Sequence, residues 1–304
     1  MTRRTVKLLV AAVAMLGAGL YSYAPARLGA LVLLGRSPVC PLANALKGAD
    51  NLRVQIAIKD WILAASKMLE KDQAGYEHWE TPYGRFWIPD GSRYVLPFNL
   101  AEQERRIYGA GERAVQAGDV VLDCGANVGV YTRVALNAGA RLVVAIEPAP
   151  ENIECLRRNF SSEIAAGKLA VYEKGVWDKD DVMALNIDPH NSAADSFIIQ
   201  REGGHEGSKA LLTTIDKLAA ELKLDRVDYI KMDIEGAEQR ALIGARATLE
   251  KFHPRLSLSA YHNPADPEKI PLLVRQAWPG YRMECGPCAE ANWGVRPDVL
   301  YFFP

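Results

Sequence analysis

The feature that most constrains the fold is an apolar run that leads into two glycines, within Val120–Gly129. Its first five residues, Val-Val-Leu-Asp-Cys, are typical of a buried parallel strand. Gly125 and Gly129 let the backbone turn tightly and approach a ligand where any Cβ would clash. The sequence therefore predicts a strand that feeds a ligand-binding turn.

A helix and a second buried strand are predicted after this turn. The apolar period becomes helical over residues 131–138, and residues 141–146 form another apolar run that ends at Glu147. In such a unit the loop amides and the helix N-terminus face the ligand, and an acid at the tip of the second strand can accept hydrogen bonds from both ribose hydroxyls. The unit therefore predicts a nucleoside cofactor.

The spacing of the glycines indicates which cofactor this is. A nicotinamide fingerprint would read Gly-x-Gly-x-x-Gly, whereas three residues separate Gly125 from Gly129. Asp123 precedes them, and a carboxylate there would repel a diphosphate but would suit a cationic ligand. S-adenosylmethionine (SAM) carries both an ammonium and a sulfonium group.

Three motifs occur in order along the chain. They are Asp-Cys-Gly-Ala-Asn-Val-Gly at 123–129, Ala-Ile-Glu-Pro at 145–148, and Tyr-Ile-Lys-Met-Asp-Ile-Glu-Gly-Ala-Glu at 229–238. Together they resemble the FkbM family of SAM-dependent methyltransferases, over roughly Gly118 to Leu258. The resemblance implies a Rossmann-like methyltransferase fold with SAM as its cofactor.

Strands and helices alternate along residues 101–304, which predicts an α/β fold with a doubly wound, mostly parallel sheet. The resemblance implies seven strands. Ligand residues should then lie along the carboxyl edge of the sheet. The expected cofactor-binding residues are Asp123, Gly125, Asn127, Gly129, Glu147 and Asp178. For the acids, capping of the following helix or a solvated turn is the alternative role.

A second group of acids follows the strand predicted at 228–234. Alternation places Asp233 and Glu235 on the same side of the strand end, and Glu238 in the first turn of the next helix. Crowded carboxylates raise one another's pKa, so Asp233 or Glu235 could serve as a general base toward the acceptor. Three acids could also hold a divalent cation, and Glu238 could simply cap the helix. The sequence does not distinguish these roles. We predict no metal site.

His262 is the other candidate for the base. It follows the strand predicted at 255–260, and imidazole titrates near neutral pH. A lone histidine in a loop is more often structural. The predicted catalytic residues are therefore Asp233, Glu235 and His262, with the identity of the base left open.

The first 36 residues predict a membrane anchor. Leu8–Ala24 carries no charge and follows three basic residues, and residues 28–34 form a second apolar stretch. Pro25 argues against cleavage of a signal peptide after Ala24. We expect an uncleaved anchor through residues 8–34, with the catalytic domain facing the cytosol, where SAM is found. A cleaved signal, or a hydrophobic helix that is buried or interfacial, is the alternative.

Residues 37–100 are predicted to form an accessory region. An apolar stripe opposes charged residues along 51–70, which predicts an amphipathic helix that packs on the domain or lies on a membrane. Residues 75–100 hold seven of the chain's 25 aromatic residues, with turn signals at 82–84 and 90–91, so a short meander is expected. Its rings either pack an accessory sheet or form a lid over the acceptor.

Composition excludes some classes of protein. Beyond residue 36, the chain has 31 basic and 37 acidic residues, a net charge of −6, which gives no basic excess for nucleic acid. The five cysteines are too few and scattered for a disulfide framework, so a reducing compartment is the default. Cys285 and Cys288 have the spacing of half a zinc site, but a turn is the better interpretation without a second pair.

We therefore expect a membrane-tethered SAM-dependent methyltransferase that acts on an oxygen atom. The acceptor would be a hydroxylated small molecule, a glycan or a lipid-linked molecule, a class that follows from the resemblance alone. The rival enzyme is an NAD(P)-dependent oxidoreductase, which the glycine spacing disfavours. The rival without catalysis is a membrane-anchored binding module of the same fold.

Overall fold

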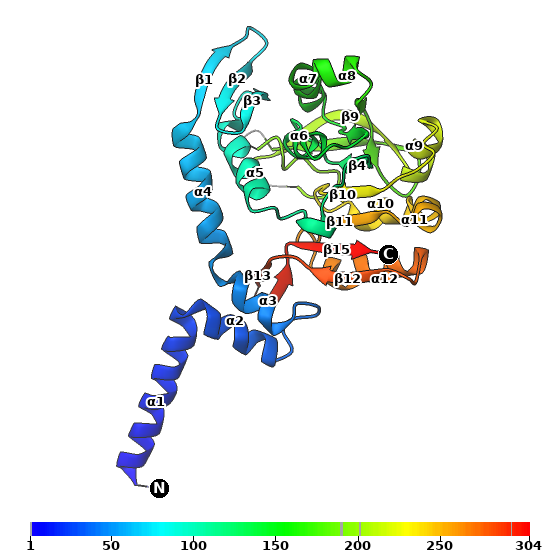
Figure 1. The fold of residues 1–304 in the computed structure, drawn as a ribbon. Helices are drawn as coiled ribbons and strands as arrows, with labels where there is room; N and C mark the ends of the chain where they lie inside the picture. Colours follow the sequence, from blue (N-terminus) through cyan, green and yellow to red (C-terminus); the bar gives the residue numbers. More distant parts are fainter. Residues whose placement is uncertain (1, 189–190, 201, 293) are drawn as a thin grey trace.

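The computed structural model describes residues 2–188, 191–200, 202–292 and 294–304. Its centre is a seven-stranded sheet in the order β12-β15-β11-β10-β4-β5-β6 (Figure 1). In that order the strands are Arg282–Cys285, Val299–Phe303, Arg255–Ser259, Tyr229–Met232, Val120–Cys124, Leu142–Ile146 and Leu169–Tyr172. Strand β15 pairs antiparallel with both of its neighbours, and the other pairings are parallel. The predicted α/β fold with seven mostly parallel strands is confirmed.

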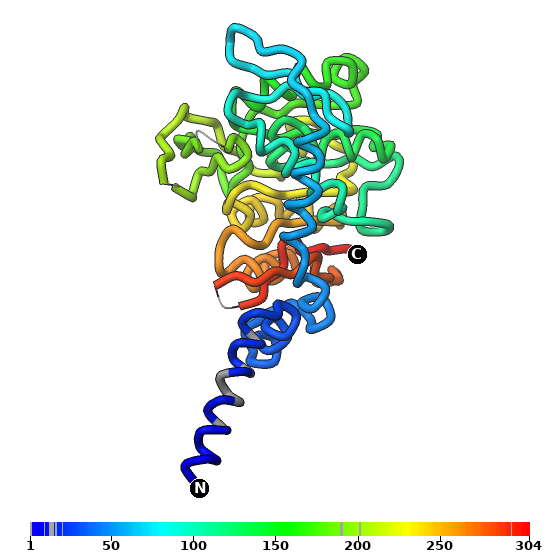
Figure 2. The backbone as a smooth tube through the Cα atoms, turned by 90° about the vertical axis from the view of Figure 1, so that its left-hand side faces the viewer, coloured from blue at the N-terminus to red at the C-terminus, as the bar shows by residue number. Residues whose placement is uncertain are grey.

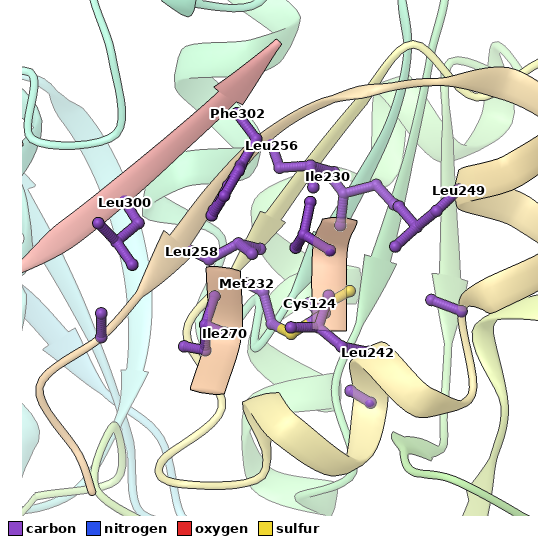
Figure 3. Packing of buried hydrophobic residues seen from close by; sticks show 14 of the residues in the cluster. Cys124, Ile230, Met232, Leu242, Leu249, Leu256, Leu258, Ile270, Leu300 and Phe302 are labelled. Atoms are coloured by element: carbon purple, nitrogen blue, oxygen red, sulfur yellow. The ribbon is translucent and has the colours of Figure 1, made fainter. Parts of the chain in front are cut away.

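Helices cover both faces of this sheet, because the strands are apolar on both sides. One face packs on α9 (Ile215–Glu221), α10 (Glu238–Ile243), α11 (Arg246–Phe252) and α12 (Asp266–Ala277). Figure 3 shows this core, where Ile230 and Met232 of β10 lie among leucines of β11, β15 and the helices. The other face packs on α6 (Val130–Asn137), α7 (Pro150–Asn159) and α8 (Ser161–Ala165). Alternation along β10 therefore turns Tyr229 and Lys231 to this second face.

Three elements around the central sheet are short or interrupted. After β6, the two-residue strand β7 (Gly175–Val176) belongs to a small sheet with β9 (His205–Thr213) and β8 (Asp181–Ile187). Helix α5 (Val95–Glu104) ends well before β4 begins. Helices α10 and α11 are separated at Gly244, where a Cβ would lie 2.1 Å from the carbonyl oxygen of Trp177.

The N-terminal apolar stretch falls in two helices. These are α1 (Arg3–Ser22) and α2 (Ala24–Leu33), and α1 extends away from the rest of the molecule (Figures 1 and 2). Within the described part of the chain, no helix combines the length and the apolarity needed to cross a membrane. The predicted anchor, and the membrane location with a cytosol-facing domain that it implied, are therefore wrong. The physical reason is that the break at Tyr23 and the basic residues inside α1 leave an apolar helix well short of the ~20 residues needed.

The accessory region contains helix α4 and a three-stranded sheet. The helix predicted at 51–70 is α4 (Asn51–Ala65), and its last residues belong to β1 (Lys67–Lys71), which pairs with β2 (Tyr76–Thr81) and then β3 (Gly84–Pro89). Figure 1 shows α4 running along the edge of the domain toward this sheet, which lies beside α7. The side chain of Asn159 at the end of α7 accepts from the N–H of Trp87 at 2.6 Å and donates to its carbonyl at 3.0 Å. The predicted meander is thus present, and it is tied to the domain.

A disulfide joins the two ends of the chain. Cys40, before α3 (Leu42–Lys47), is bonded to Cys288 at the start of β13 (Cys288–Ala291), 248 residues later. The hairpin partner of β13 is β14 (Gly294–Pro297). The cysteine count had predicted no disulfide framework and a reducing compartment by default. It gave no signal for this single bond, because pairing depends on which distant segments the fold brings together.

We predict that this disulfide contributes to stability by restricting the unfolded chain. Cys40→Ala should lower the free energy of unfolding by about 2 to 4 kcal/mol. The measurement is urea unfolding of the wild type and the variant, each with and without a reductant. The reductant should destabilise only the wild type; an equal response of both proteins would contradict the prediction.

Candidate functional site

Two cavities meet at the carboxyl edge of the central sheet. The first has a volume of about 410 Å³ and the second of about 50 Å³. Both are lined by Gly125, Asn127, Ala193, Asp233 and Glu235. Two of the sequence-predicted catalytic residues and two of the predicted cofactor residues therefore lie at the boundary between them.

The glycine turn brings the backbone of β4 against that of β10. Gly125 has a left-handed φ of 77°, and a Cβ there would lie 1.9 Å from the carbonyl oxygen of Asp233. Asn127 and Glu235 also have positive φ values, 50° and 53°, which are uncommon for residues other than glycine. Strained backbone of this kind is concentrated at functional sites, and here it occurs on both sides of the boundary.

Glu147 stands at the tip of β5 and lines the second cavity. Its carboxylate accepts hydrogen bonds from the backbone N–H of Asn127 at 2.8 Å and of Ala149 at 3.0 Å. Burial raises the pKa of Glu147 to about 7, although these hydrogen bonds lower it. The acid predicted from the sequence is therefore in place beside the glycine turn.

The remaining walls of the second cavity come from several strand ends and loops. They are largely apolar and include Ile146, Val176, Leu185 and Phe197. The volume of about 50 Å³ is far below the ~300 Å³ of a small-molecule site. The carbonyl of Ser192 accepts from the side chains of Asn127 at 3.1 Å and Asn152 at 3.2 Å, next to Glu147. The Ser192 carbonyl thus lies at the wall of the second cavity, beside Glu147.

Asp123, which we expected to bind the cofactor, lies outside the two cavities. It is fully buried, and the described residues that line the two cavities do not include it. Its carboxylate accepts from the hydroxyl of Thr132 at 2.7 Å and lies 3.3 Å from the ammonium of Lys231. Parallel pairing of β4 with β10 places Lys231 directly beside Asp123, so the acid is neutralised within the protein.

Lys231 connects this buried pair to the first cavity. Its ammonium donates to the carbonyl of Gly125 at 2.8 Å and lies 5.4 Å from the ring centre of Tyr108. Burial would lower the pKa of Lys231, but the charges of Asp123 and Asp233 raise it, so the lysine remains charged. The charged ammonium of Lys231 therefore stabilises the glycine turn through its hydrogen bond to the carbonyl of Gly125.

Asp178 and Gly129, which we also expected to bind the cofactor, make contacts within the protein. Asp178 accepts from the guanidinium of Arg240 at 2.7 Å, and Gly129 caps α6 with a φ of 91°. Neither is among the described residues that line the cavities. Arg240 comes from α10, so the sequence around Asp178 gave no sign that its partner would be a guanidinium instead of an adenine.

The acids after β10 gather around His262. Its Nδ1 donates to Glu238 at 2.9 Å, and its Nε2 lies 3.5 Å from Asp233 and 3.4 Å from Glu235. Burial would lower the pKa of His262, but these carboxylates raise it to about 11. In this state the imidazole is protonated at neutral pH and is a poor general base.

Asp233 is held by the residues around it. The hydroxyl of Tyr108 donates to its Oδ2 at 2.6 Å. Burial would raise the pKa of Asp233, but the charges of His262 and Lys231 and the Tyr108 hydrogen bond keep it below its ordinary value. Asp233 thus presents an ionised carboxylate at the boundary of the two cavities.

The first cavity has walls that sequence reasoning missed. Aromatic rings of Tyr94, Phe98, Tyr108, Tyr131 and Tyr261 line it, together with the polar side chains of Lys59, Asn99, Glu102 and Gln103. Burial and the nearby charge of Asp233 raise the pKa of Glu102 to about 8. Tyr94 and Phe98 had been noted only as part of the aromatic meander. The polar pattern of residues 99–103 gave no signal, because its role depends on α5 packing across the sheet edge.

The family model of the methyltransferase FkbM domain matches residues 123–283, more than half of the chain. The chain belongs to the FkbM methyltransferase family. No match was found among curated proteins.

Several solved structures are similar to this FkbM-family chain. Methyltransferase FkbM from Methylobacillus flagellatus KT is 20% identical, with a TM-score of 0.47 over 84% of this chain and 60% of that chain. Precorrin-6y C5,15-methyltransferase from Geobacter metallireducens GS-15 is 16% identical, with a TM-score of 0.36 over 62% of this chain and 79% of that one. Trm5b from Pyrococcus abyssi is 12% identical, with a TM-score of 0.39 over 79% and 56%. The chain thus spans 60% of the length of the Methylobacillus protein.

We predict that Lys231 is required for the stability of the FkbM domain. Lys231→Met leaves the carboxylate of Asp123 buried without its cation and should cost about 3 to 5 kcal/mol in the free energy of unfolding. Urea unfolding measures this loss. The double variant Asp123→Asn with Lys231→Met should recover most of it, and an equal loss in both variants would contradict the pairing.

Proposed function

We propose that this FkbM-family protein is a SAM-dependent O-methyltransferase whose acceptor is a hydroxylated small molecule, glycan or lipid-linked molecule. The observation that carries the proposal is the meeting of the two cavities at Asp233 and Glu235. One cavity has the residues of a nucleoside site, and the other has aromatic and polar walls suited to an organic acceptor.

The cofactor site is built from the glycine turn and the tip of β5. Glu147 would accept hydrogen bonds from ribose hydroxyls, and the backbone of Gly125 and Asn127 would lie against the cofactor. The apolar walls at Val176 and Phe197 would hold the adenine. When bound, SAM supplies a methyl group on a positively charged sulfur, which is already activated for transfer.

The protein's own residues then align the acceptor and manage its proton. Methyl transfer needs an in-line approach of the acceptor oxygen, so positioning in the first cavity is a large part of catalysis. Asp233 and Glu235 offer carboxylate oxygens to an acceptor hydroxyl at the boundary. Ser192 lines the second cavity and accepts from the side chain of Asn127, so it would lie against a bound cofactor.

The first cavity supports a ring-bearing or chain-bearing hydroxylated acceptor. Its tyrosine and phenylalanine rings provide flat apolar surface, while Lys59, Asn99 and Gln103 can bind hydroxyl or carbonyl groups. A nucleic acid is disfavoured as the acceptor, because the body of the chain carries a net charge of −6.

We predict that cofactor affinity depends on the ionisation of Glu147. Its pKa of about 7 means that the carboxylate is mostly protonated at pH 6 and mostly ionised at pH 8. Only the ionised form accepts from both ribose hydroxyls, so SAM should bind about tenfold more tightly at pH 8 than at pH 6. Equilibrium dialysis at the two pH values measures this change.

The matched variants are Glu147→Gln and Glu173→Gln. Glu147→Gln should weaken binding by about 1 to 3 kcal/mol and remove the pH dependence. Glu173 is exposed and is not among the described residues lining the second cavity, so its variant should behave as the wild type. A pH dependence that survives in Glu147→Gln would assign it to another group.

We predict that Asp233 acts on the acceptor and not on the cofactor. Asp233→Asn should lower turnover by about 100-fold to 10,000-fold while SAM affinity changes little. The acceptor can be found by mass spectrometry of extracts incubated with SAM and the protein, as a gain of one methyl group that the variant does not produce. If no extract component gains a methyl group although SAM binds, the protein is a binding module and the proposed function is wrong.

A further inference from the structure

Glu102 is a carboxyl group in the wall of the first cavity that lacks a counter-ion. It lies on α5, is half-buried, and lines the cavity together with Asp233. Among the described residues it forms no ion pair. The cation that acts on it, Lys231, is paired with Asp123 instead, at 3.3 Å. Glu102 therefore shares the cavity with an ionised carboxylate and has no cation of its own.

Two hydrogen bonds in series fix one oxygen of this carboxyl group. Gln55, a buried residue of α4, donates from its Nε2 to Glu102 Oε1 at 3.3 Å, and its own Oε1 accepts from the guanidinium of Arg105. A guanidinium can only donate, so the amide oxygen of Gln55 must face Arg105 and its NH₂ group must face Glu102. Glu102 Oε1 is therefore held as an acceptor.

The other oxygen of Glu102, Oε2, is the one left for a bound molecule. No hydrogen bond reaches it from the described residues, and the side chain lines the first cavity. If the carboxyl group carries a proton, that proton is on Oε2, because Oε1 already accepts from Gln55. A protonated Glu102 thus offers an O–H donor to the cavity.

The surroundings favour this proton. Burial and the charge of Asp233 raise the pKa of Glu102 to about 8. Burial also acts on Asp233, but the charges of His262 and Lys231 keep the pKa of Asp233 below its ordinary value. Two carboxyl groups of one cavity are therefore in opposite states at neutral pH. Environments that separate two pKa values in this way assign one group as the donor and the other as the acceptor.

Other charged or titratable groups surround Glu102 from several elements. They are Lys59 of α4, Arg105 and Tyr108 after α5, Lys231, Asp233 and Glu235 at the end of β10, Tyr261 after β11, and Asp298 before β15. Burial raises the pKa of both tyrosines well above its ordinary value and that of Asp298 to about 6. A rise from pH 7 to pH 9 therefore ionises Glu102, while Asp298 stays ionised and the tyrosines stay protonated.

We propose that Glu102 is a neutral carboxylic acid at physiological pH and donates a hydrogen bond from Oε2 to a second oxygen of the acceptor. Asp233 accepts from the hydroxyl that receives the methyl group. The proposal rests on the proposed function, because it takes the first cavity as the acceptor site. It narrows the acceptor to molecules that carry, besides this hydroxyl, an oxygen that accepts a hydrogen bond, such as the ring ether of a sugar.

The test uses two ring alcohols that differ at one position. Tetrahydropyran-methanol has a hydroxyl and a ring ether oxygen, and cyclohexylmethanol has a CH₂ group in place of the ether. Their binding to the full-length protein is measured by ligand-observed NMR at pH 7 and pH 9. Infrared spectroscopy follows the carbonyl band of protonated Glu102. We expect this band at pH 7, its loss in Glu102→Gln, and its shift to lower frequency when tetrahydropyran-methanol binds.

The ratio of the two dissociation constants reports the hydrogen bond to the ether. Glu102→Leu should lower the preference for the ether roughly 2- to 10-fold, and a change from pH 7 to pH 9 should lower it in the wild type. Glu102→Gln should keep the preference at both pH values, because its amide also donates. Glu104→Gln is the control and should match the wild type, since Glu104 is exposed on the same helix and is not among the described residues that line the cavities.

Three results would overturn the proposal. They are the absence of a Glu102 band at pH 7, a band that tetrahydropyran-methanol leaves unmoved at any soluble concentration, and an equal preference in the wild type and Glu102→Leu. A loss of turnover of about 100-fold or more in Glu102→Gln, on the acceptor found in extracts, would also overturn it, since Glu102 would then be a general base. An infrared shift without methylation of any extract component would support the hydrogen bond and refute the proposed methyl transfer alone.

Discussion

The buried pair of Asp123 and Lys231 is the interaction on which the site depends. It joins β4 to β10 at their carboxyl ends, where the ammonium of Lys231 also donates to the carbonyl of Gly125. This contact fixes the glycine turn against β10. The turn therefore lies next to the acidic residues that follow β10. Burying two charges is costly unless they are paired, so the pair also specifies that these two strands are neighbours.

The site is built from two segments of the chain, one inside and one before the region that the family model matches. The walls of the second cavity come from strand ends and turns inside the region that the FkbM model matches, residues 123–283. Much of the first cavity, where we propose that the acceptor binds, comes from residues 94–108, which precede that region. The second part is placed by α4 and α5, which pack on one another, and by the small sheet bonded to α7. Differences in that segment would change the acceptor without disturbing the cofactor walls.

The sequence predicted the sheet well because its evidence is local. Apolar runs, glycines and strand-end acids at Val120–Gly129 and Glu147 specify parallel strands and their ligand edge without knowledge of distant residues. It did not predict that Asp123 and Asp178 would each pair with a cation from a later element, Lys231 and Arg240. The α5 residues, the disulfide at Cys40 and the N-terminal helices were missed or misassigned. The roles of the α5 residues and of Cys40 are set by tertiary packing. The N-terminal apolar stretch is divided into α1 and α2, and a hydropathy pattern does not show this break.

The most direct test of the account is parallel calorimetric titration of the purified protein with SAM and with NAD at pH 8. A glycine turn without the diphosphate fingerprint, next to an ionised Glu147, predicts saturable binding of one SAM per chain and no binding of NAD. Saturable binding of NAD with none of SAM would contradict the central claim, since the same cavity would then have been assigned the wrong cofactor.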